Sequence, residues 1–126
     1  MELTVTIVQD EDALFRRLHE HFVKADGTVT SAAFKTNSKP DNQISTDLAR
    51  LTTPQESVYR AGRPGFLLGE LFAKEPRELG FEVNHDPLPD NFAHTLIAGE
   101  NTKLRCRELA KLVRIIQEIH STDSET

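Results

Sequence analysis

Short connections between strand-like segments are the feature that most restricts the fold of this chain. Residues 81–85 and 93–98 alternate between apolar and polar side chains, which is typical of strands, and only a proline-rich loop separates them. Parallel strands need a crossover of about a dozen residues or more, so segments this close pair antiparallel. The sequence therefore predicts an α+β fold with a mainly antiparallel sheet.

Alternation, capping residues and turn residues place the other elements. Thr53, Pro54 and Glu56 match the start of a helix, with Thr53 as N-cap. Acidic residues followed by Leu14, Phe15, Leu18 and Phe22 favour another helix near the start of the chain. The further expected strands are 3–8, 28–34, 43–48 and 66–72, with 28–48 as a long-looped hairpin, and the expected helices are 11–23, 53–62 and 75–79.

The end of the chain predicts a long amphipathic helix from about 101 to 120, packed on one face of the sheet. Its apolar stripe consists of Leu109, Leu112, Val113, Ile116 and Ile119, together with Cys106. A basic stripe lies opposite, and we interpret it as a solvated face in preference to the alternative, a docking surface for a phosphate backbone or acidic partner. The residues of this stripe are Lys103, Arg107, Lys111 and Arg114.

Composition limits the class of protein. A chain of 126 residues with 37% hydrophobic content fits one domain, which we assign to 1–120, followed by a polar tail at 121–126 that we expect to be disordered. The single cysteine, Cys106, favours a reducing, cytoplasmic compartment, and we expect neither a signal peptide nor a membrane span. The net charge of −5 argues against unselective binding to nucleic acid or anionic lipid.

The loop from His85 to His94 carries the most chemistry of any short stretch. Pro87 and Pro89 hold its backbone extended, and Asp90 followed by Asn91 suits a turn. Histidine changes charge near neutral pH, so a stiff loop displaying two imidazoles is a candidate site.

Several functions of this loop remain open. His85, Asp86 and His94 are legitimate metal ligands, but their spacing matches no known template, so we expect no metal and no cofactor. The two histidines also suit acid and base roles across a ribose 2′-hydroxyl, with Arg17 or Lys103 stabilising the phosphate. A nucleotide transfer using Arg17, Ser31 and a glutamate is another alternative. In the structural alternative, the His94 ring bonds the loop backbone and Asn91 caps the turn.

Four segments together resemble a group of short bacterial proteins with no assigned activity. The similarity covers about 14–113, and Phe92 stands where that group has a proline. The resemblance implies a bacterial single-domain protein and no catalytic residues. The segments are R-R-L-H at 16–19, V-T-S-A-A-F at 29–34, I-S-T-D at 44–47 and D-P-L-P-D-N-F-A-H at 86–94.

We therefore expect recognition of a protein partner or small ligand through the 85–94 loop. The alternative is a metal-independent nuclease, phosphodiesterase or nucleotide-transferring enzyme, and whether the protein is an enzyme stays open. Loops cluster where strand ends meet, so the polar groups of 28–48 and of this loop are expected to adjoin. The catalytic candidates are Arg17, His19, His85 and His94, and the binding candidates are Ser31, Ser45, Asp47, Asp86, Asn91 and His94.

Overall fold

Within residues 4–35 and 43–117, which the computed structural model describes, six strands form one sheet in the order β4-β5-β2-β1-β3-β6. Every pair of neighbouring strands is antiparallel, as the sequence predicts. The strands are β1 (Ala13–His19), β2 (Gln43–Leu48), β3 (Phe66–Phe72), β4 (Glu82–His85), β5 (His94–Ala98) and β6 (Arg114–Gln117).

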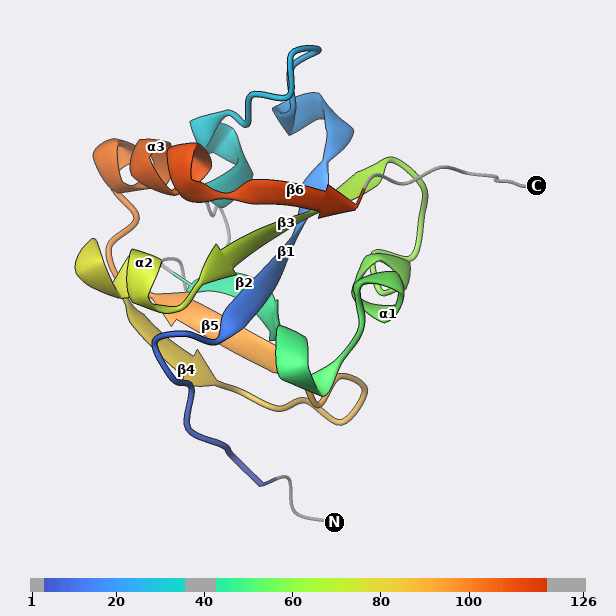
Figure 1. Cartoon of the computed structure of the whole chain (residues 1–126), viewed down its shortest axis with the longest axis vertical. Coiled ribbons are helices and arrows are strands. Elements are labelled where there is room, and N and C mark those ends of the chain that lie inside the picture. The colour runs from blue at the N-terminus through green and yellow to red at the C-terminus, as the bar shows by residue number, and fades with distance from the viewer. Residues whose placement is uncertain (1–3, 36–42, 118–126) are drawn as a thin grey trace.

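Short helices connect these strands. Figure 1 shows α2 and α3 at one end of the sheet and α1 at the other, where α1 packs beside β1 and β3. The helices are α1 (Pro54–Tyr59), α2 (Lys74–Glu78) and α3 (Lys103–Leu112), and 3-10 helices span Glu20–Phe22, Ser31–Phe34 and Ala49–Leu51.

The two faces of the sheet differ in character. Because successive side chains of a strand alternate, Ile44 and Leu48 point into the main core, while Ser45 and Asp47 point to the other face. In the main core, strand residues pack with Phe34 and with Leu109 of α3. The face of Ser45 and Asp47, beside α1, carries the polar groups described below.

The helix expected over 11–23 is wrong, because this segment forms β1 and a 3-10 helix. Leu14 and Leu18, four residues apart, share one face of a strand as readily as one face of a helix. Phe15 is also buried, on the opposite face. A central strand that buries both faces therefore explains the apolar spacing that suggested a helix.

The strands expected over 3–8 and 28–34 are also wrong. Residues 4–8 form no strand, and the side chains of Val5 and Ile7, which are the apolar side of the alternation, are 64% and 76% exposed, whereas Val8 is buried in the core. The segment Ser31–Phe34 is a 3-10 helix. Consequently 28–48 is no hairpin, and β2 pairs instead with β1 and β5.

The long C-terminal helix is not observed, because α3 ends at Leu112 and the chain continues as β6. The β-branched run Val113, Ile115 and Ile116 favours a strand, and β3 offers an edge for it to pair with. The predicted tail at 121–126 lies outside the described residues.

The remaining elements agree with the sequence. Thr53 caps α1, since its Oγ1 accepts the amide hydrogen of Glu56 at 3.1 Å. Gly69 in β3 allows the side chain of Val113 to pack closely against the β3 backbone, because a Cβ at Gly69 would lie 2.6 Å from Val113 Cγ2. The confirmed elements are β2, α1, β3, α2, β4 and β5. Among the described residues, no helix is long and apolar enough to cross a membrane.

Candidate functional site

Strand register brings polar residues of three strands together. Asp47 of β2 lies opposite Phe15 of β1 and opposite His94 of β5, so all three side chains share one face. Arg17 and Ser45 are each two residues from members of this row and therefore point to the same face. The expected meeting of the 28–48 segment with the 85–94 loop therefore holds for Ser45 and Asp47, which lie beside His94 and Asn91, and it does not hold for Ser31 or His85.

Asp47 is the centre of this cluster, and its side chain is fully buried. Its Oδ2 accepts hydrogen bonds from Ser57 Oγ at 2.6 Å, Arg17 Nη1 at 3.0 Å and Arg60 Nη1 at 3.1 Å. Its Oδ1 accepts one from Asn91 Nδ2 at 2.8 Å. The carboxylate therefore joins β1, β2, α1 and the proline-rich loop.

These contacts keep the Asp47 carboxylate charged. Burial by itself raises its pKa, but the hydrogen bonds from Ser57 and Asn91, and the charges of Arg17 and Arg60, outweigh burial. The pKa of Asp47 is therefore lowered from its ordinary value of 3.8.

Both arginines keep hydrogen-bond donors available. To the described residues, Arg17 donates only through Nη1, to Asp47 and to the Ser57 carbonyl oxygen, and Arg60 only through Nη1, to Asp47 and Thr52. Among the described residues, no acceptor binds Nη2 or Nε of either side chain. The two side chains are 22% and 26% exposed, so these donors are accessible from solvent.

The surroundings of His94 fix which ring nitrogen carries the proton. Nδ1 faces two acceptors, Asp86 Oδ2 at 3.1 Å and the Asp86 carbonyl oxygen at 3.0 Å. Nδ1 must therefore be protonated, so the neutral ring has its lone pair on Nε2. Nε2 lies 3.2 Å from Ser45 Oγ, which can donate its hydroxyl proton to it. Ser45, His94 and Asp86 thus form a continuous chain of hydrogen bonds.

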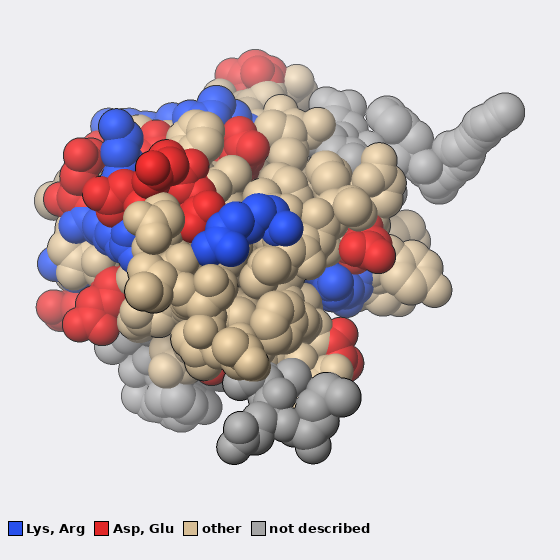
Figure 2. Space-filling view, turned by 60° about the horizontal axis from the view of Figure 1, so that its bottom comes forward, with Lys and Arg blue, Asp and Glu red and all other residues tan. Residues whose placement is uncertain are grey.

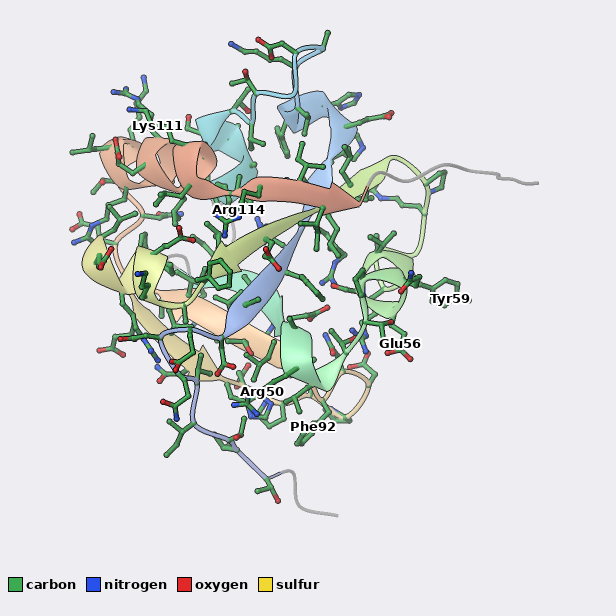
Figure 3. The ribbon with its side chains drawn as sticks, in the orientation of Figure 1. Arg50, Glu56, Tyr59, Phe92, Lys111 and Arg114 are labelled. Carbon is green, nitrogen blue, oxygen red and sulfur yellow. The ribbon has the colours of Figure 1, made fainter. Side chains whose placement is uncertain are left out.

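A groove of about 450 Å³ opens over this cluster. A second groove of about 520 Å³ shares Tyr59, Arg60 and Asp90 with it and continues along α1. Figure 3 shows Tyr59 projecting from α1 away from the sheet, and this side chain is 85% exposed. The residues that line the first groove are Arg17, Ser45, Tyr59, Arg60, Leu88, Asp90, Asn91 and His94.

Arg16 supports Ser45 from the opposite face of the sheet. Its guanidinium donates to the Ser45 carbonyl oxygen and to the Ala33 carbonyl oxygen, both at 2.8 Å. Burial, and the nearby charge of Arg17, lower the pKa of Arg16 to about 10. Arg16 therefore ties β2 to the 3-10 helix behind it.

Three candidates lie apart from the groove. His85 points to the opposite face of the hairpin, where Nδ1 accepts the Thr6 amide hydrogen at 2.9 Å and Nε2 contacts the Phe92 carbonyl oxygen at 2.6 Å. His19 packs edge-on against Phe66, with ring centroids 5.1 Å apart. Ser31 begins a 3-10 helix and does not line the groove. His85 and His94 therefore do not face one another as an acid and base pair.

Sequence reasoning missed the contribution of α1. Ser57 and Arg60 are three residues apart, so both side chains reach Asp47 from one side of the helix. The signal was available in the capped helix start at Thr53, which follows soon after β2. Within the described residues, no group of three or more His, Cys, Asp or Glu side chains is placed to hold a metal ion.

The predicted basic stripe is interrupted. Lys103, Arg107 and Lys111 are exposed on α3, but Arg114 lies on β6, 3.8 Å from Glu70 and 3.7 Å from Glu75. Figure 3 shows Lys111 pointing away from the sheet, unlike Arg114. On the face shown in Figure 2, acidic and basic side chains lie side by side, without a continuous field of one sign.

Comparison of this chain with models of protein families, with curated proteins and with solved structures found no match. The function is therefore inferred from the geometry of the groove.

Proposed function

We propose that the protein binds a nucleotide in the groove lined by residues of β1, β2 and β5, by the end of α1 and by the 85–94 loop. The observation that carries this proposal is the pair of guanidiniums of Arg17 and Arg60, which line one groove with Nη2 and Nε unused by the described residues. Planar guanidinium groups bind phosphate oxygens through paired hydrogen bonds.

Other lining residues favour a nucleotide over a simple phosphate. The exposed ring of Tyr59 offers a surface on which a base can stack. Asp90 supplies a carboxylate, and such a group accepts hydrogen bonds from ribose hydroxyls in other nucleotide sites. The second groove, which shares Tyr59, Arg60 and Asp90, lengthens the available space along α1.

Asp47 prepares the arginines for this ligand. Its single negative charge is shared by the two guanidiniums, so neither arginine is fully neutralised by Asp47. Because Asp47 holds Nη1 of both side chains, less conformational entropy is lost when a phosphate binds.

A small ligand is favoured over a protein partner because most of the residues that line the groove are polar or charged. Among the described residues, Leu88 is the one aliphatic side chain that lines it, and it is 37% exposed. Protein interfaces are usually built around larger buried apolar anchors.

The proposal is tested by isothermal titration calorimetry with AMP, ATP, cyclic AMP, NAD and a short RNA, each with and without a chelator. We expect at least one nucleotide to bind, and Arg17→Gln or Arg60→Gln to weaken it by about tenfold or more, equivalent to about 1.4 kcal/mol. Arg107→Gln, on the exposed side of α3, is the matched control and should leave the affinity unchanged. Absence of binding to every nucleotide, or an equal loss in the Arg107 variant, would refute the proposal.

A further inference from the structure

We propose that Ser45, His94 and Asp86 act as nucleophile, general base and positioning carboxylate in phosphoryl transfer from a phosphate ester. The choice of a phosphate ester rests on the proposed nucleotide binding, whereas the activation of Ser45 rests on the hydrogen-bond chain alone.

The geometry of this hydrogen-bond chain supports activation of the Ser45 hydroxyl. Ser45 Oγ lies 3.2 Å from His94 Nε2, and His94 Nδ1 lies 3.1 Å from Asp86 Oδ2. These separations are within reach for proton transfer from a hydroxyl to an imidazole whose tautomer is fixed by a carboxylate. His94 is only 9% exposed, and its backbone belongs to β5, so its ring is held in place by the sheet.

The position of these three residues relative to the arginines supports a phosphorus atom as the electrophile. Ser45, His94, Arg17 and Arg60 line the same groove. Negative charge is spread over the phosphoryl oxygens in the transition state, and two guanidiniums match that distribution.

The reaction balances with water as the second substrate. Ser45 Oγ forms a bond to phosphorus as its proton moves to His94 Nε2, and the bond from phosphorus to the leaving alcohol oxygen breaks. His94 then gives that proton to the leaving oxygen. Water then attacks the phosphorus of the phosphoserine and gives a proton to His94 Nε2. The bond from phosphorus to Ser45 Oγ breaks, and His94 returns that proton to Oγ, which releases the phosphate product and restores the Ser45 hydroxyl. Asp86 keeps the proton on Nδ1 and does not touch the substrate.

The role of Ser45 is tested with diisopropyl fluorophosphate, an uncharged reagent that phosphorylates activated serines with loss of fluoride. Intact-mass measurement and peptide mapping of the full chain should find one adduct, on Ser45, and none in Ser45→Ala. His94→Gln should slow labelling by about 100-fold or more, because it removes the base. His21→Gln, an exposed histidine outside the groove, should label at the normal rate.

Asp86 is tested as a positioning residue through the pH dependence of the labelling rate. Asp86→Asn should lower the rate and displace its pH profile, while Asp86→Glu should restore part of the rate. A purely structural role would change the thermal unfolding temperature without displacing the profile.

Failure of this inference is distinguishable from failure of nucleotide binding. The reagent carries no charge and its reaction needs no bound nucleotide, so Ser45 of the unaltered protein should be labelled even where no nucleotide binds. With bis(p-nitrophenyl) phosphate, release of p-nitrophenolate should require both Ser45 and Arg17. A folded protein that takes up no adduct, or an equal rate in His94→Gln, would overturn the assignment of Ser45. Labelling without any turnover of the anionic ester would overturn the assignment to phosphoryl transfer.

Discussion

A carboxylate as deeply buried as that of Asp47 is unfavourable unless its charge is balanced and its oxygens accept hydrogen bonds. Four side chains do this here, and they come from β1, α1 and the proline-rich loop. Asp47 therefore links the stability of the fold to the geometry of the groove. The same carboxylate that holds the chain together also fixes the orientation of Arg17 and Arg60.

This role of Asp47 predicts a loss of stability in acid. Its pKa in the folded state is below its ordinary value, so its interactions stabilise the fold above about pH 4 and are lost as the pH falls through the folded-state pKa. Urea unfolding measured from about pH 6 to about pH 2 should show this loss. Asp47→Asn should be less stable near neutral pH and should lose less stability on acidification. An acid dependence unchanged in that variant would contradict the role given to Asp47.

At the scale of elements, the helices and strands that were predicted correctly are those whose ends are marked by capping or turn residues. The helix start at Thr53 and the hairpin of β4 and β5 are examples. The spacing of Leu14 and Leu18 fits a helix and a strand equally, and only the presence of β2 and β3 on either side decides between them. The change from α3 to β6 at Val113 likewise depends on the edge of β3, which local sequence does not reveal.

Because the chain forms α3 and β6 and not one long helix, the residues expected to contribute most to stability are different. Leu109 is fully buried, so Leu109→Ala should lower the free energy of unfolding by about 2–5 kcal/mol. Ile116 is 41% exposed on β6, so Ile116→Ala should cost about 1 kcal/mol or less. Denaturant unfolding of the two variants measures both values. A loss at Ile116 as large as that at Leu109 would place Ile116 in a buried interface that this fold does not provide.

At the scale of the whole molecule, the antiparallel sheet follows from short connections, but its order does not. β2 pairs with β5 across a sequence separation that includes α1, β3, α2 and β4, and no local pattern encodes that choice. The residues of the site likewise divide into those that the sequence identifies and those that only the packing of elements brings together. Ser45, Asp47, Asn91 and His94 were identifiable from their chemistry, whereas Ser57, Tyr59 and Arg60 join them only because α1 packs beside β1 and β3.

The central claim is that this assembled groove, and not the basic side of α3, is the ligand-binding site. The most direct test is a two-dimensional amide NMR titration of the full chain with the tightest-binding nucleotide of the calorimetric panel. If the groove binds the nucleotide, shift changes should concentrate at Ser45, Asp47, Arg60, Asp90 and Asn91. Changes confined to Lys103, Arg107 and Lys111, with the groove unaffected, would contradict it.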